Sequence, residues 1–201
     1  MRGTLSSVTL VFLLSPARLD GPRGASLLSG ALATDLARRL GTREGAPVAE
    51  VFSFVSALYF RGKYAYARAF ARPPEGLAGA WVITSAAGLR PAESRTTRRQ
   101  LARWAEVGID PRDPTYRRPL VRDARRLARE AGPATRFVLL GSLATRKYVD
   151  PLHEALGDRL LHPPALVGVG DMQRGSRLLA AVREDRPFEY APWCPRAPAG
   201  T

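Results

Sequence analysis

The chain has 201 residues, with 31 Lys plus Arg against 18 Asp plus Glu and a formal net charge of +13. Its one cysteine, Cys194, excludes an intramolecular disulfide and a cysteine-only zinc or iron–sulfur site built by this chain alone. The length predicts a single domain over residues 1–194, followed by a disordered tail over 195–201. Cysteine usage of this kind fits the reducing cytoplasm, where we expect the protein to reside.

The positive charge comes almost entirely from arginine, because Lys63 and Lys147 are the only lysines. A surplus of this size attracts nucleic acid, nucleotides or acidic partners, with a strength that falls as salt rises. The alternative is a generally basic surface with no specific ligand. Heavy Arg, Ala, Pro and Gly usage is also typical of GC-rich coding, which accounts for part of the preference for arginine.

The first apolar segment, residues 8–14 (VTLVFLL), is followed by Ser15 and Pro16. Seven residues are too few to span a bilayer, which takes about 20, and lie at the short limit for a secretory signal. A β-branched apolar run that ends at Ser-Pro predicts a buried strand of a parallel sheet. We therefore expect no membrane association.

The next segments alternate between patterns typical of helices and strands. Leucines recur every four residues from 28 to 40 and predict one helix that ends before Gly41. Residues 51–55 (VFSFV) could form a short strand, and residues 56–71 predict a helix that stops before Pro73.

The second half continues the alternation. Residues 81–84 (WVIT) and 137–140 (FVLL) predict strands. Between them, residues 90–130 predict two helices separated by the turn-rich segment 108–119. In the second helix, Leu120, Val121, Ala124, Leu127 and Ala128 form the expected buried face, while Arg122, Arg125, Arg126 and Arg129 point outward.

The last segments predict a short helix over 152–156, a weak strand over 159–162 and an amphipathic helix over 176–184. Strands that are separated by helices indicate βαβ units. The fold class we predict is therefore α/β, a mostly parallel sheet with helices on both faces in a single domain.

Polar and small residues follow the predicted strands, where open parallel sheets bind their ligands. Backbone donors at glycines and small hydroxyl residues suit a phosphate or carboxylate, although strand-to-helix turns favour the same residues for structural reasons. The expected ligand-binding residues at these strand ends are Ser15, Arg18, Thr84, Ser85, Gly88, Gly141, Ser142, Thr145 and Tyr148.

A glycine-rich run, GVGDMQRG at 168–175, precedes the last predicted helix. It shares only the first two glycines of the dinucleotide fingerprint, and the chain contains no Walker phosphate loop. A phosphate cradle that involves Gly168, Gly170 and Arg174 remains possible, because the run opens a helix. Asp171 within it could act as a general base or accept a sugar hydroxyl, or could simply cap the following turn.

Both lysines stand directly before a tyrosine in a chain that otherwise uses arginine. A lysine can lose its proton when it is buried and an arginine cannot, so a catalytic role is one reason to retain it. We predict that Lys147 and Asp171 meet at one sheet edge as catalytic groups, with Lys63 adding a second charge. Chance is the alternative explanation.

Arginines and aromatic residues alternate along 58–70 (LYFRGKYAYARAF), which includes Arg61. Such a segment could contact single-stranded nucleic acid, although half of its aromatics must face the core. The two histidines, His153 and His162, lack the spacing of metal ligands, so we predict no metal site and no cofactor.

Four segments together resemble a bacterial family of small domains of unknown function that is distantly related to the peroxide-stress protein YaaA. The family has a "LYxxxLFRKxxxYA" helix and a "WxILSAKxGL" strand and loop; here the loop's usual lysine is Ala87. The resemblance implies an α/β fold and an association with nucleic acid, including modified-base or DNA-damage contexts, but no established reaction. The matching residues are Leu58, Tyr59, Phe60, Arg61, Tyr66, Trp81, Ile83, Ser85, Ala86, Gly88 and Leu89.

These observations lead to three functional hypotheses. The first is a basic protein that binds or acts on nucleic acid or nucleotides at the carboxyl edge of its sheet. The second is a small-molecule enzyme for a nucleotide or a phosphosugar, and the third is a protein that binds partners through a generic basic surface. The sequence does not decide whether the protein is an enzyme.

Overall fold

A computed structural model describes residues 8–56 and 58–194 of the chain. Within them, six strands form one sheet in the order β4-β3-β1-β6-β7-β8. The four inner strands run parallel, and β4 and β8 pair antiparallel at the two edges. The α/β class with a mostly parallel sheet is therefore confirmed. The strands are β1 (Leu10–Leu14), β3 (Ala80–Ile83), β4 (Leu89–Pro91), β6 (Arg136–Leu140), β7 (Leu160–His162) and β8 (Ala191–Pro192).

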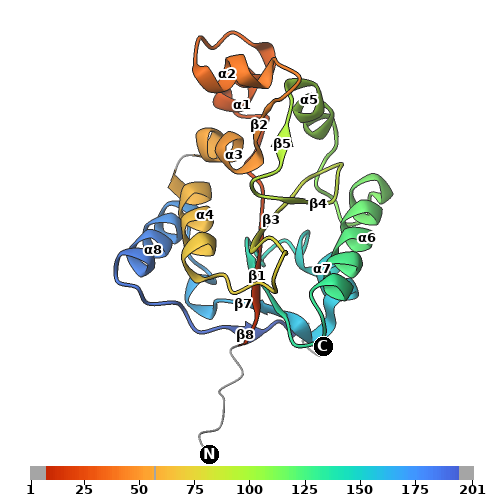
Figure 1. Ribbon diagram of the computed structural model, residues 1–201, viewed down its shortest axis with the longest axis vertical. Coiled ribbons are helices and arrows are strands. Elements are labelled where there is room, and N and C mark those ends of the chain that lie inside the picture. Colours follow the sequence, from red (N-terminus) through yellow and green to blue (C-terminus); the bar gives the residue numbers. More distant parts are fainter. Residues whose placement is uncertain (1–7, 57, 195–201) are drawn as a thin grey trace, which may run out of the picture.

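Helices cover both faces of the sheet, because the side chains of each strand alternate between them. Phe12 and Leu14 of β1 pack toward α4 and α8, whereas Val11 and Leu13 pack toward α6 and α7. Figure 1 shows these two helix pairs on opposite sides of the strands. The bounds are α4 (Leu58–Phe70), α6 (Pro114–Glu130), α7 (Val149–Leu156) and α8 (Asp171–Arg183), with 3-10 turns at Gly157–Arg159 and Pro164–Leu166.

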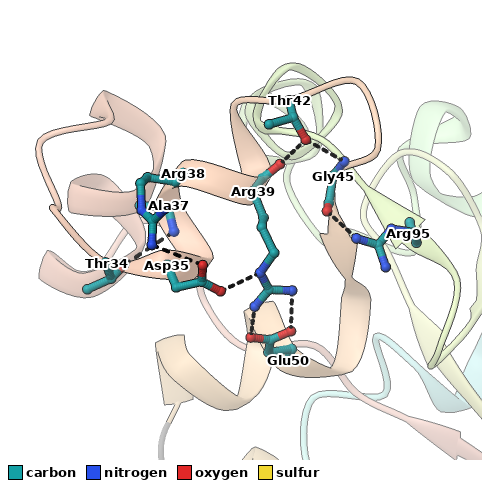
Figure 2. Close-up of polar contacts among 9 residues, drawn as sticks. All are labelled: Thr34, Asp35, Ala37, Arg38, Arg39, Thr42, Gly45, Glu50 and Arg95. Carbon is teal, nitrogen blue, oxygen red and sulfur yellow. Dashed lines mark hydrogen bonds and ion pairs between the residues drawn. The ribbon is translucent and has the colours of Figure 1, made fainter.

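The remaining elements gather at one end of the molecule, shown at the top of Figure 1, and we call this part the helical lobe. Figure 2 shows how Arg39 ties it together: its guanidinium donates to both carboxylate oxygens of Glu50 and to Asp35. The lobe comprises α1 (Pro22–Ser29), α2 (Asp35–Leu40), β2 (Ala46–Pro47), α3 (Val48–Ser56), β5 (Arg95–Thr96) and α5 (Arg98–Glu106).

The single helix predicted from the leucines between 28 and 40 is wrong: α1 and α2 are separate helices. Gly30 follows α1 with φ of +76°, a left-handed conformation that ends a helix and favours glycine. Thr34 then caps α2 by accepting a hydrogen bond from the backbone N–H of Ala37 at 3.2 Å. The regular spacing of the leucines thus extends over two helices, because Gly30 ends the first of them.

The strand predicted over 51–55 is also wrong, because this segment lies within α3. Its buried residues Val48, Ala49, Val51 and Phe52 lie on one helical face and pack in the main core cluster. A short apolar run does not by itself distinguish a strand from a buried helix.

Three other helices begin earlier than expected, among them α7, which starts at Val149 rather than at residue 152. Helix α6 starts at Pro114, inside the segment predicted as turns, with Asp113 as its N-cap residue. Helix α8 starts at Asp171 rather than at residue 176, so Asp171 and Gly175 are helical residues and not part of a flexible loop.

No helix in the described parts of the chain combines the length and apolarity needed to cross a membrane. The tail predicted over 195–201 lies outside the described residues.

Candidate functional site

β1 and β6 are adjacent parallel strands, and the chain continues from them to opposite sides of the sheet. After β1 it reaches β3 through α4 on one face of the sheet, and after β6 it reaches β7 through α7 on the other face. Ser15, the first residue after β1, donates its backbone N–H to the oxygen of Leu140 in β6 at 3.1 Å. Such a switch point is where open α/β sheets bind their ligands.

Lys63 of α4 reaches this switch point from one face of the sheet. Its side chain is only 1% exposed, and its Nζ donates to the backbone oxygen of Ser15 at 2.5 Å and to Ser15 Oγ at 2.8 Å. The ammonium also lies 4.3 Å from the centre of the Tyr59 ring. Among the described residues, no carboxylate forms an ion pair with Lys63.

This environment lowers the pKa of Lys63 to about 7, mainly because burial penalises the charged amine. The carboxylate of Asp171 opposes the shift, and the guanidinium of Arg174 adds to it. Lys63 therefore changes protonation near neutral pH, which an arginine at this position could not do.

Two glycines let α4 and α8 approach closely enough to bring these groups together. A side chain at Gly62 would come within 2.8 Å of the backbone oxygen of Gly175. One at Gly175 would come within 3.0 Å of the backbone oxygen of Leu58. This close contact places the Lys63 side of α4 against the first turn of α8.

Arg174 in the first turns of α8 is 9% exposed and is fixed by three contacts. Its Nε donates to the backbone oxygen of Leu166 at 3.1 Å, and its Nη1 pairs with Asp171 at 3.3 Å. Its guanidinium carbon lies 5.9 Å from the ring centre of Tyr59. A cation held in this way is preorganised for an anion.

Tyr148 closes the site from the opposite side of the switch point. It is buried, and burial raises the pKa of its phenol, with further contributions from Tyr59 and Asp171. The Nζ of Lys147 lies 5.2 Å from its ring centre. Tyr148 is thus a neighbour of both residues that the sequence paired as catalytic groups, Lys147 and Asp171.

A cavity of about 930 Å³ opens beside this cluster, at the carboxyl ends of β6 and β7, and we call it the edge cavity. Gly141, Gly168, Gly170 and Arg174, all predicted as ligand-binding residues, line it. Gly170 is the N-cap residue of α8 and has no side chain to cap the first turn. The first backbone N–H groups of α8, which have no partner within the helix, therefore lie next to the wall of the cavity.

Other predicted residues line a second, smaller cavity of about 270 Å³ between the helical lobe and the strands. They are Arg18, Ser85 and Lys147, next to the aromatic side chain of Trp104. Arg18 is already paired with Asp20 at 2.6 Å. The predicted ligand-binding residues are thus divided between two separate cavities.

The predicted residues after β3 bond within their own loop and to α5. Thr84 Oγ1 donates to the oxygen of Gly88 at 2.9 Å, and Ser85 Oγ donates to the oxygen of Trp104. Gly88 has φ of +64°, and a side chain there would come within 2.2 Å of Asp123 Oδ2. In the structure these residues hold the loop against α6.

The other predicted residues are more peripheral. Arg61 is exposed on α4, and Ser142 and Thr145 lie half-buried and exposed in the loop after β6. No group of three His, Cys, Asp or Glu residues in the described segments is arranged to hold a metal ion.

The sequence reasoning did not include Tyr59, Arg146 and Trp193 as site residues. Tyr59 precedes Lys63 by one helical turn, a spacing that could have identified it. Arg146 and Trp193 both line the edge cavity, with the guanidinium carbon 5.4 Å from the Trp193 ring centre. They lie 47 residues apart in the chain, so no local pattern connects them.

No protein-family model, curated protein or solved structure matches this chain. The resemblance to the YaaA-related family therefore stays a prediction.

Proposed function

We propose that the protein binds a nucleotide, either free or within a nucleic acid, in the edge cavity. The observation that carries this proposal is the buried Arg174 guanidinium, which lines a cavity of about 930 Å³ at the carboxyl edge. Pockets for small molecules and cofactors are typically about 300–1,000 Å³. The cavity therefore has the size and the charge that a nucleotide needs.

The phosphate would sit at Gly168 and Gly170, where the first turn of α8 offers backbone N–H groups and a positive helix end. Arg174 would supply a charged hydrogen bond from its remaining guanidinium nitrogen. The rings of the ligand would occupy the apolar part of the cavity, which includes Leu166 and Trp193. The net charge of +13 would attract such a ligand from solution.

Titration calorimetry with nucleoside mono-, di- and triphosphates tests this proposal. We expect Arg174→Gln to weaken binding at least tenfold, because a charged hydrogen bond contributes about 1.5–3 kcal/mol. The matched control is Arg177→Gln, which removes the same charge from the next turn of α8 without touching the edge cavity. Equal affinities of both variants would contradict the proposal, and melting curves would show that both remain folded.

The burial of Lys63 favours a second candidate, an enzyme that acts on a nucleotide or a phosphosugar. An amine with a pKa of about 7 can accept a proton from a substrate at neutral pH. Mass spectrometry of nucleotides incubated with the protein would detect turnover. We expect Lys63→Met to abolish turnover while Lys147→Met retains it; the absence of any product in the wild type would rule this candidate out.

A further inference from the structure

A second basic region lies in the helical lobe, away from the edge cavity. A shallow groove of about 680 Å³ runs between the ends of α1 and α2 and the start of α5, and we call it the lobe groove. Arg43, Arg98 and Arg99 line it, and none of the described residues along it is acidic. A nearby acid, Glu44, accepts a hydrogen bond at its backbone oxygen from Arg95 Nε at 2.8 Å.

Arg98 gives the groove its shape. Its Nη2 donates to the backbone oxygen of Ala37 in α2 at 2.7 Å. The guanidinium lies against two glycines: a side chain at Gly30 would come within 2.9 Å of Nη1, and one at Gly41 within 3.5 Å of Nη2. Arg98 thus fixes α5 against the carboxyl ends of α1 and α2, where a cation is favourable.

Arg43 and Arg99 have no comparable partner. Both are exposed, and neither forms an ion pair or a side-chain hydrogen bond with any described residue. Their charges are therefore available to an external anion.

The outward-facing arginine stripe on α6 differs in this respect. Arg122 pairs with Asp123 at 2.9 Å, and Arg125 pairs with Glu154 at 2.9 Å. Arg126 lies 3.6 Å from Glu130. Acidic neighbours offset much of the charge of this stripe, whereas none of the described residues that line the lobe groove is acidic.

We propose that the lobe groove binds the phosphates of a nucleic-acid strand and is separate from the edge cavity. Two exposed guanidinium groups in an open groove hold a single phosphate weakly. Along a strand, each phosphate contact releases counterions, and the contacts add up. Contacts of this kind position a strand without reading its sequence, so the groove would hold nucleic acids of any sequence.

The test measures the anisotropy of a labelled single-stranded DNA oligonucleotide at several salt concentrations. The variant is Arg43→Gln with Arg99→Gln, and the control is Arg125→Gln with Arg126→Gln on α6, which removes the same charge. The slope of log K against log salt changes by about 0.7 for each phosphate contact on a single strand. We expect the magnitude of this slope to fall by about 1.4 in the groove variant, which lacks two phosphate contacts, and to change less in the control.

Three outcomes would overturn the groove proposal: no binding by the wild type, no change of slope in the groove variant, or an equal change in the control. A free nucleoside triphosphate, titrated in parallel, separates this proposal from the one for the edge cavity. The groove variant should bind it as the wild type does. If Arg174→Gln weakens the binding of neither the free nucleotide nor the oligonucleotide, the edge-cavity proposal fails while the groove proposal stands.

Discussion

Lys63 shows how a single residue is set apart by its surroundings. Arginine is the default cation in this chain, yet a lysine occupies the one described position where a cation is fully enclosed against the end of β1. Its amine has two hydrogen bonds to Ser15 and an aromatic ring beside it, but no paired carboxylate. Such a group is costly to keep charged, so its protonation is linked to stability.

This linkage has a definite sign. The pKa of Lys63 is about 7 in the folded protein, and that of a lysine in an unfolded chain is about 10.4. Between these values the unfolded chain binds more protons, so the contribution of Lys63 to the free energy of unfolding rises with pH. Below pH 7 both states are protonated and the contribution is constant.

We therefore expect the wild type to gain stability relative to Lys63→Met as the pH rises from 7 toward 10. Urea unfolding of both proteins between pH 6 and pH 9.5 measures this difference at each pH. Lys147→Met serves as the control, because it replaces the other lysine of the chain, which is only half-buried. A difference between wild type and Lys63→Met that does not depend on pH would show that Lys63 keeps an ordinary pKa.

At the scale of elements, the contact between α4 and α8 decides whether the site can form. Gly62 faces the backbone of Gly175, and neither position has room for a methyl group without movement of the backbone. A helical glycine costs about 1 kcal/mol relative to alanine. Here that cost is offset by a close helix contact that positions Lys63 beside Arg174.

Gly62→Ala should accordingly destabilise the protein by about 1–3 kcal/mol, the usual cost of overpacking a core, even though alanine favours the helix. Thermal and urea unfolding measure the loss. Gly108→Ala is the control, because a side chain there meets nothing within 4 Å. A Gly62→Ala variant as stable as the wild type would mean that α4 and α8 do not approach as closely as described.

The patterns in the sequence predicted some elements well and others poorly, for physical reasons. The runs at 81–84 and 137–140 correspond to the buried strands β3 (Ala80–Ile83) and β6 (Arg136–Leu140), because an apolar run that is covered on both faces needs no alternation. Residues 51–55 have a similar composition and form a helix, since tertiary packing in the lobe overrides local preference. Gly175 was read as part of a loop, because its role depends on Leu58, a residue far away in the chain.

The candidate site was predictable to the extent that it follows from topology. Ser15 and Gly141 were predicted because each follows a predicted strand, and the topology brings these two residues together at the switch point. The sequence paired Asp171 with Lys147, and that pairing stays a prediction; Asp171 acts electrostatically on Lys63. That α4 brings Lys63 to the end of β1 depends on how the helix packs against the sheet. No spacing in the sequence predicts this packing.

At the scale of the whole molecule, some of the basic side chains are paired with acids and others are not. On α6 and at the edge cavity the arginines are paired with acids, whereas Arg43 and Arg99 of the lobe groove form no ion pair with a described residue. A single nucleotide and an extended strand would thus meet different parts of the protein. The central claim concerns the first of these, the nucleotide in the edge cavity.

Photo-crosslinking with an azido-nucleotide, followed by peptide mapping, tests this claim most directly, because it reports where the ligand lies as well as whether it binds. We predict labelling within the segments 139–146, 162–174 and 192–194, which contribute the lining of the edge cavity, and competition by unlabelled nucleotide. Arg174→Gln should reduce this labelling, and Arg177→Gln should leave it unchanged. Labelling that excess nucleotide does not suppress, or that falls outside these segments, would contradict the account.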